Sequence, residues 1–477
     1  MLVRAKVDFN RKVLDWDGFG FNYVETAQTK DYTTDPQDYG GFSILSKEKQ
    51  EEILQLVFGK NGLRPSVIKL FLDPFHQTHE KENGTNISDI DPVNYDHVTY
   101  TKQMLFFVKR GMELAKEQKQ ELSFLTTLYG PPAFMTKQKT LRGLNLDENY
   151  KLELAKYIVS WAEFLRKEME IPVTYLSIHN EGEDYHRWPY DGSSANLGTG
   201  HDYNMYWPPE LVAEMMPLIQ SVIQARGDKN LFVTPGETSS WNRFDSWGYA
   251  DAIINNEEAL NAIGLITSHG FISGLPGDAF YGDFRSAGID KIKEKRPKLH
   301  VWTTSTTWGQ MDASFIYNLH ELIYSTKSNA VIPWAGIQRP TLWVGGDPNP
   351  GNAILIKEDG TYQIRDGYYY YKQVCPVGQA GMYVAQASAA HSQACVFAFA
   401  KNTTKHPNAF VVVNASNQEA EFKIEVVGQN GKSYSATRTA APMEYGKDMG
   451  TYQVDGGTIA YMAPANSVTT FIEREGC

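Results

Sequence analysis

The chain has 477 residues, of which 42% are hydrophobic and 21% charged, a balance that is ordinary for a globular protein with one large and one smaller domain. Its net charge of −11 and the absence of any block rich in Lys and Arg argue against a nucleic-acid partner. No apolar run reaches the length of a membrane span. Three scattered cysteines are too few for a disulfide framework or a zinc site, and we expect no metal and no organic cofactor.

The first segment, MLVRAKVDF, lacks the apolar core of a signal peptide. We therefore expect either a cytoplasmic protein or a secreted one whose leader peptide has been removed. The sequence does not indicate an oligomeric state.

Strand-like and helix-like segments alternate along the first part of the chain. Residues 1–10 alternate in polarity and predict an exposed strand, and Ser46 is a candidate N-cap for the first helix. Helices are predicted at 46–63, 100–118 and 149–169. Strands are predicted to lie between these helices and to end near Asn22, Asp73, Tyr129 and Asn180.

The alternation continues after a loop at 184–208 that is rich in Tyr, Trp, Gly and His. Loops of this length are usually functional or disordered. A helix is predicted at 210–227, and four further strands are predicted to end near Glu237, His269, Ser305 and Trp334.

Eight strands separated mostly by helices predict a (β/α)₈ barrel, an α/β fold of the TIM-barrel type. Polar or aromatic residues stand at nearly every strand end, as expected if the carboxyl ends of the strands form an active site. The alternative is a doubly wound open sheet. It is disfavoured because no glycine-rich phosphate loop follows the first strand.

After residue 374 the pattern changes to short alternating runs separated by turn residues, which predict an antiparallel β-sandwich of about a hundred residues. We expect residues 1–10 to add a strand to it. The predicted domains are therefore a barrel at 11–374 and a side domain formed by 1–10 and 375–477.

The stretch IPVTYLSIHNEGED at 171–184 carries the first candidate for catalysis. A carboxylate at the carboxyl end of a buried strand can have its pKa raised and face a substrate, which makes Glu181 a candidate general acid. The alternative is a loop carboxylate that merely follows a strand. Glu183 and Asp184 are further candidates for a catalytic carboxylate, but the favoured interpretation is that they are solvated loop charges.

Several motifs, in order, resemble glycoside hydrolase family 30, in the clan of (β/α)₈ glycosidases. They are Gly18-Phe19-Gly20 with Glu25, LVFGKNGLRPSVIKLFLDP with Lys69 where Arg is more usual, TLYGPPAFM, HNEGE and GYYYYKQV. The resemblance covers the whole chain. It implies a carbohydrate substrate, Glu181 as the acid/base and Asn180 as a ligand of the sugar 2-hydroxyl.

The chain departs from the family at the seventh strand, where VWTTSTTWG places Ser305 at the position of the nucleophilic Glu. Trp302 and Thr304 align with the family's motif. A serine hydroxyl is a poor nucleophile towards an oxocarbenium-like centre. Three explanations stay open: an engineered replacement of the nucleophile, the use of another carboxylate, or a protein that binds sugars without hydrolysing them.

Glu237 is the best remaining partner for Glu181, because it ends the neighbouring fifth strand. Its alternative role is a substrate hydrogen bond or a structural salt bridge. We further expect a set of substrate-binding residues at the strand ends. Among them, Arg339 is a basic residue that suggests a substrate containing a uronate. The set is Asn180, Tyr129, His269, Ser305, Trp334, Asp73, Trp302 and Arg339. The predicted function is hydrolysis of the O-glycosidic bonds of an oligo- or polysaccharide.

Overall fold

The computed structural model describes residues 1–23, 40–80, 83–191, 193, 203–271, 287–339 and 351–474. Eight parallel strands in these ranges form the predicted barrel, in the order β6-β5-β4-β3-β2-β9-β8-β7. They are β2 (Gly18–Asn22), β3 (Val67–Leu72), β4 (Ser123–Leu128), β5 (Val173–Ser177), β6 (Phe232–Thr234), β7 (Ile266–Ser268), β8 (Val301–Thr303) and β9 (Ala330–Val331). Asn22 is the last residue of β2, and each of the other seven expected strand ends follows one of these strands, so the (β/α)₈ fold is confirmed.

The barrel closes between β6 and β7 through a short contact rather than a full ladder. Val233 on β6 forms a parallel bridge with Ile263, just before β7. The hydroxyl of Thr267 on β7 donates to the carbonyl of Gly236 at 2.7 Å. The carboxyl ends of β6 and β7 are therefore held together, which brings the residues that follow these two strands close to each other.

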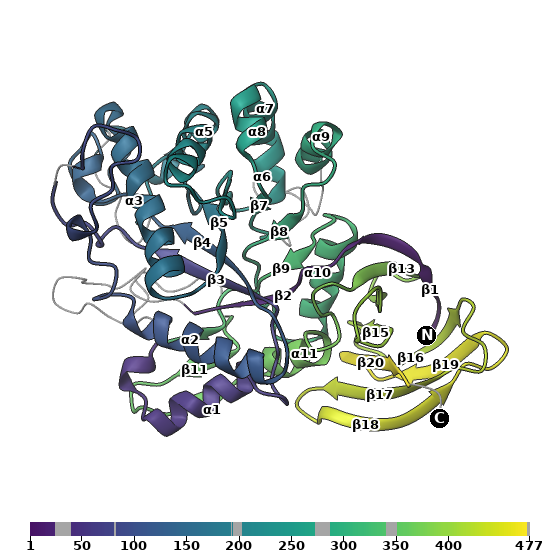
Figure 1. Ribbon diagram of the computed structural model, residues 1–477. Coiled ribbons are helices and arrows are strands. Elements are labelled where there is room, and N and C mark those ends of the chain that lie inside the picture. The colour runs from purple at the N-terminus through teal and green to yellow at the C-terminus, as the bar shows by residue number, and fades with distance from the viewer. Residues whose placement is uncertain are drawn as a thin grey trace.

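Helices flank the strands on the outside of the barrel (Figure 1). They are α1 (Lys47–Phe58), α2 (Lys102–Glu117), α3 (Lys151–Glu163), α5 (Pro209–Ala225), α6 (Trp241–Ser246), α7 (Tyr249–Ile254), α8 (Glu257–Ala262), α9 (Ala287–Lys295), α10 (Ala313–Tyr324) and α11 (Asp366–Val374). The local sequence explains α1: Ser46 caps it by accepting from the Lys49 amide at 3.3 Å, and its apolar face (Ile53, Leu54, Val57, Phe58) is buried.

Short helical turns and a small sheet complete the connections. The turns are η1 (Phe42–Ile44), η2 (Pro92–Asn94), η3 (Ala133–Met135), η4 (Glu148–Tyr150), the π-helical η5 (Phe164–Glu168) and η6 (Tyr185–Arg187). The small sheet follows the eighth barrel strand and consists of β10 (Ile337–Gln338), β11 (Ile354–Ile356) and β12 (Tyr362–Ile364).

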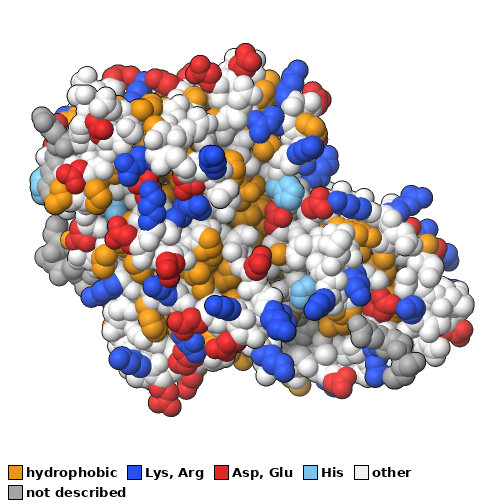
Figure 2. Space-filling model, in the orientation of Figure 1, with side chains coloured by type: hydrophobic (Ala, Val, Ile, Leu, Met, Phe, Trp, Pro, Cys, Tyr) orange, Lys and Arg blue, Asp and Glu red, His pale blue; other side chains and the backbone are white. Residues whose placement is uncertain are grey.

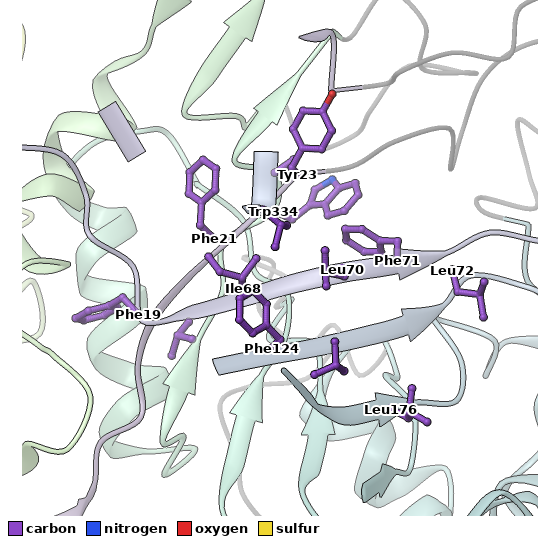
Figure 3. Packing of buried hydrophobic residues seen from close by; sticks show 14 of the residues in the cluster. Phe19, Phe21, Tyr23, Ile68, Leu70, Phe71, Leu72, Phe124, Leu176 and Trp334 are labelled. Atoms are coloured by element: carbon purple, nitrogen blue, oxygen red, sulfur yellow. The ribbon is translucent and has the colours of Figure 1, made fainter. Parts of the chain in front are cut away.

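The barrel strands are buried on both faces, so their sequences are mainly apolar runs and do not alternate between apolar and polar residues. All six residues of β3 are buried. Figure 3 shows Ile68 and Leu70 on β3 with Phe124 on β4 and the aromatic side chains of Phe19 and Phe21 on β2. Burial on both faces is the usual property of strands in a parallel barrel.

The side domain is a nine-stranded sheet that lies at one end of the molecule together with both chain termini (Figure 1). Its strands are β1 (Leu2–Asp15), β13 (Tyr383–Ala389), β14 (Ala394–Ala400), β15 (Ala409–Asn414), β16 (Ala420–Val426), β17 (Ser433–Ala440), β18 (Glu444–Gln453), β19 (Thr458–Ala463) and β20 (Ser467–Glu473). The N-terminal strand joins this sheet and continues past residue 10 to Asp15. It pairs antiparallel with β13 but parallel with β16, which the alternating pattern did not predict.

Hydrogen bonds tie the side sheet to the barrel. Gln373 on α11 accepts from the Thr470 hydroxyl of β20 at 2.6 Å through its backbone carbonyl. Its side-chain oxygen accepts from Thr439 on β17 at 2.9 Å. On the other side, the Tyr324 hydroxyl of α10 donates to the carbonyl of Ala385 on β13 at 2.7 Å. These contacts join the side sheet to the helices of the barrel.

Basic and acidic side chains are interspersed over the face of the molecule seen in Figure 2. Among the residues described, no helix combines the length and the apolar character that crossing a membrane requires. Cys375 and Cys395 are buried free thiols, and Cys477 lies outside the described residues.

Candidate active site

Three of the residues predicted from the sequence contact one another at the carboxyl ends of β5, β6 and β7. Nδ1 of His269 lies 2.7 Å from Oε1 of Glu181. Nε2 of the same ring lies 2.9 Å from Oε2 of Glu237. One imidazole therefore links the two candidate carboxylates, and the side chains are at most 7% exposed.

The backbone around Glu181 explains how its side chain reaches this point. After β5 ends at Ser177, Asn180 forms a parallel bridge with Glu237, and the Glu181 amide donates to the Glu237 carbonyl at 2.7 Å. Glu181 then adopts a left-handed conformation with φ of 50°, which is uncommon for a residue with a side chain. Arg187 on η6 donates to the Glu181 carbonyl at 2.9 Å and lies 3.6 Å from Oε2 of its carboxylate.

Glu237 is enclosed and surrounded by donors. The Lys69 ammonium on β3 lies 2.5 Å from Oε2, and the Thr127 hydroxyl on β4 donates to Oε1 at 2.9 Å. Burial alone would raise the pKa of Glu237, but the charge of Lys69 and the hydrogen bond from His269 outweigh it and lower this pKa to about 2. Glu237 is therefore an ionised carboxylate with no exposed surface.

His269 has two acceptors for two ring nitrogens. Burial would lower the pKa of the imidazole, but hydrogen bonds to Glu181 and Glu237 outweigh burial and raise it. The two carboxylates are not equivalent, because the Lys69 ammonium and the Thr127 hydroxyl both contact the Glu237 carboxylate. Two carboxyl groups in unequal surroundings are the arrangement that can separate an acid from a permanently charged partner.

Tyr129 and Trp334 lie at the ends of β4 and β9 on either side of Phe71. The Tyr129 ring stacks on Phe71 with centroids 4.8 Å apart, and Trp334 meets it edge-on at 5.9 Å, beside the β3 strand in Figure 3. The Trp334 amide donates to the Thr306 carbonyl at 2.7 Å. Both aromatic side chains are buried and pack against Phe71 at the strand ends.

Asp73 and Asn180 are also buried at the strand ends, and both have partners in the backbone. Asp73 accepts from the Phe75 amide at 2.9 Å through its carboxylate, and its carbonyl accepts from the Tyr157 hydroxyl. The Asn180 carbonyl accepts from the Asn204 side chain. These contacts hold the two segments in place.

Ser305 follows β8 and contacts Gly270, the residue after His269. Its carbonyl accepts from the Gly270 amide at 2.7 Å, and the residue is 2% exposed. The next acidic residue in the chain, Asp312, caps α10 by accepting from the Ser314 amide at 2.9 Å. Asp312 therefore caps the start of α10 and does not replace the missing carboxylate at Ser305.

Two of the predicted binding residues lie apart from this group. Trp302 donates to Asp17, which precedes β2, at 2.7 Å and thus belongs to the amino-terminal end of the barrel. Arg339 follows β10 and forms an ion pair with Glu358 at 3.2 Å. Neither has a contact with Glu181, Glu237 or His269 among the described interactions.

The expectation that Glu183 and Asp184 are solvated loop charges is wrong. Glu183 forms a fully buried ion pair with Arg243 at 2.7 Å and accepts from the Ser239 amide at 2.9 Å. Burial would raise the pKa of Glu183, but the charges of Arg187 and Arg243 lower it. Asp184 is 6% exposed and caps η6 by accepting from the His186 amide. A partner 60 positions away explains the burial of Glu183, and a local helix cap explains that of Asp184.

Lys69, Thr127 and Arg187 were not among the predicted site residues. For Lys69 a signal was present: it stands inside the apolar run VIKLFL, and a Lys in a doubly buried strand needs a counter-charge. For Thr127 and Arg187 the sequence offers no comparable signal. In the described part of the chain, no group of three or more His, Cys, Asp or Glu side chains is arranged to hold a metal.

Solved structures share this fold over nearly the full chain. The catalytic domain of GH30 xylanase C from Talaromyces cellulolyticus matches with a TM-score of 0.71 and 16% identity, over 99% of this chain and 100% of that one. A GH30 endoxylanase from Clostridium papyrosolvens matches with a TM-score of 0.67 and 16% identity, again over 99% and 100%. An endo-β1,6-glucanase matches with a TM-score of 0.67 and 15% identity, over 99% of this chain and 94% of that one.

No family model matches the sequence, and no curated protein matches it. The chain therefore has the barrel and side domain of GH30 catalytic domains at a low level of sequence identity, which confirms the resemblance at the level of fold.

Proposed function

We propose that this protein hydrolyses O-glycosidic bonds of an oligo- or polysaccharide, with Glu181 as the general acid/base. The observation that carries the proposal is the contact of Glu181 and Glu237 with one imidazole at the carboxyl ends of neighbouring barrel strands. Glycosidases of both stereochemical classes use a pair of carboxyl groups. The relatives in fold are named as xylanases and an endo-β1,6-glucanase, which supports a carbohydrate substrate.

The roles of the two carboxyl groups follow from their surroundings. An acid must hold a proton at the working pH, and its partner must be ionised. Lys69 keeps Glu237 ionised, so the proton of the pair belongs to Glu181. Glu237 is then the second carboxylate of the proposal. Because Lys69, Thr127 and His269 already bind its oxygens, we assign it an electrostatic role rather than direct attack on the sugar.

A panel of polysaccharides tests the proposal, and it includes β-1,4-xylan, β-1,6-glucan and mixed β-glucans. We expect the wild type to release reducing ends from at least one of them, and Glu181→Gln to lose roughly 10²–10⁴-fold in kcat/KM. The anomer of the first product, read by NMR, then distinguishes retention from inversion. Unchanged activity in Glu181→Gln would remove Glu181 from the mechanism.

Ser305 favours a second candidate function, a protein that binds carbohydrate without turnover. A hydroxyl stands there in place of the carboxylate that the resemblance implies, and the positive charges of Lys69 and Arg187 offset the carboxylates of Glu237 and Glu181. Calorimetric binding of an oligosaccharide that is not cleaved would support this function. A large gain of retaining activity in Ser305→Glu would instead indicate a hydrolase whose nucleophile has been replaced.

A further inference from the structure

Four side chains, from barrel strand β3 and from the loops that follow β5, β6 and β7, form one continuous series of contacts. Lys69 on β3 binds Glu237 after β6 at 2.5 Å, Glu237 binds His269 after β7 at 2.9 Å, and His269 binds Glu181 after β5 at 2.7 Å. Every member has a side chain that is at most 7% exposed. Electrostatic effects along this series of contacts are therefore poorly screened by water.

The two carboxylates in this series of contacts have different surroundings, and the difference favours proton transfer from His269 to Glu181 rather than to Glu237. The Glu237 carboxylate is compensated by the Lys69 ammonium at 2.5 Å and by the Thr127 hydroxyl at 2.9 Å. At Glu181 the nearest described cation is Arg187, 3.6 Å from Oε2, with a side chain at the edge of the buried region (13% exposed). The proton on Nε2 of His269 therefore stays on the ring and donates to Glu237. The proton on Nδ1 is available for transfer to Glu181.

We propose that His269 is a proton relay that loads Glu181, with Glu237 and Lys69 as positioning residues that direct the transfer. The imidazolium passes its Nδ1 proton to Oε1 of Glu181 and becomes a neutral ring. Its Nε2–H continues to donate to Glu237, which fixes the tautomer. Glu181 then gives its proton to the leaving oxygen of the substrate. This inference rests on the proposed function, because it assumes that Glu181 is the acid.

The charged and titratable groups that face His269 define its pH dependence. They are Glu181 and His179 on the β5 loop, Glu237 on the β6 loop, Lys69 on β3, and Arg187 beyond Glu181. Both carboxylates raise the pKa of His269 and Lys69 lowers it. The relay is therefore loaded below the pKa of His269 and empties as the pH rises through it. Removing the charge of Glu237 lowers this pKa, and the alkaline limb of kcat/KM moves to lower pH.

Imidazole ¹⁵N NMR tests the relay without any need for activity. We expect the pKa of His269 to fall in Glu237→Gln and also in Glu181→Gln, relative to the wild type. Glu181→Gln leaves the Lys69–Glu237 ion pair intact and therefore still tests the relay if Glu237→Gln does not fold. His300→Gln is the matched control and is expected to leave the pKa of His269 unchanged. It removes a comparable contact of 2.8 Å, between His300 and Asp17, at the opposite end of the barrel. An unchanged His269 pKa in all the carboxylate variants would overturn the relay.

A double-mutant cycle in kcat/KM distinguishes the relay from a Glu237 that acts on the sugar itself. If Glu237 acts only through His269, then Glu237→Gln/His269→Gln is no slower than His269→Gln alone, because the second change removes nothing further. If Glu237 contacts the substrate independently, the two losses multiply, and that result would overturn the proposal. A wild type without activity on any polysaccharide would refute the proposed function, while the NMR titration would still decide whether the relay exists.

Discussion

The Lys69 ammonium and the Glu237 carboxylate form an ion pair of 2.5 Å in which neither side chain is more than 1% exposed. Charges removed from water to this extent require each other, since the loss of one partner leaves the other uncompensated. The pair joins β3 to the segment after β6 across the interior of the barrel. It therefore contributes to the stability of the fold as well as to the charge of the candidate site.

Lys69→Met is expected to destabilise the protein by about 3–5 kcal/mol, because it leaves Glu237 buried without its cation. Lys69→Met/Glu237→Gln is expected to be more stable than Lys69→Met alone. The free energy of unfolding of each variant is measured by urea denaturation. Lys12→Met is the matched control: Lys12 also lies 2.5 Å from its partner Asp15, but both side chains are 50% exposed. A pair of that kind is worth roughly 0–1 kcal/mol. Equal effects of Lys69→Met and Lys12→Met would contradict the account.

The stability of the protein is expected to depend on pH through Glu237. Its pKa is lowered from the usual 4.5 to about 2 in the folded protein, so folding favours the ionised form. The stabilisation is fully present above pH 4.5 and is lost as the pH falls towards 2. The free energy of unfolding, measured across this window, should fall less steeply in Lys69→Met/Glu237→Gln than in the wild type. Identical slopes would show that Glu237 is not the group responsible.

Gly236 is expected to tolerate no side chain, because it places Glu237 through a backbone with φ of 85°. A Cβ at this position would lie 2.1 Å from Cδ2 of His179. Gly227→Ala is the matched control, since Gly227 has φ of 78° but nothing within 4 Å of a Cβ. We expect about 1–2 kcal/mol of destabilisation from the left-handed backbone in the control. Gly236→Ala should lose a further ~1–3 kcal/mol through overpacking, and activity with it. Equal unfolding free energies for the two variants would contradict this.

The order of strands and helices was predictable because each strand end carries a polar or aromatic residue and most strands are separated by an amphipathic helix. Ser46 illustrates the local signal, since the predicted cap is the observed one. The side sheet was predictable from alternation, as in β16 with its strict buried and exposed pattern. The parallel pairing of β1 with β16 was not, because a period of two does not specify the direction of a partner strand.

Within the candidate site, chain order predicted which residues lie near one another but not how they are bonded. Glu181, Glu237 and His269 follow neighbouring strands, and neighbouring strand ends meet in a barrel. The pairing of Glu183 with Arg243 joins residues 60 positions apart, and local composition alone made Glu183 look solvated. Such partners depend on side-chain packing in three dimensions, which a pattern along one sequence does not contain.

The leaving-group dependence of Glu181→Gln tests the central claim most directly. The measurement is kcat/KM of the wild type and the variant on two glycosides of the sugar that the wild type releases, one with a dinitrophenyl leaving group and one with an alkyl leaving group. The account predicts a loss of roughly 10²–10⁴-fold for the alkyl glycoside and little loss for the dinitrophenyl glycoside, which departs without a proton. An equal loss on both substrates, or no loss on either, would contradict the assignment of Glu181 as the general acid.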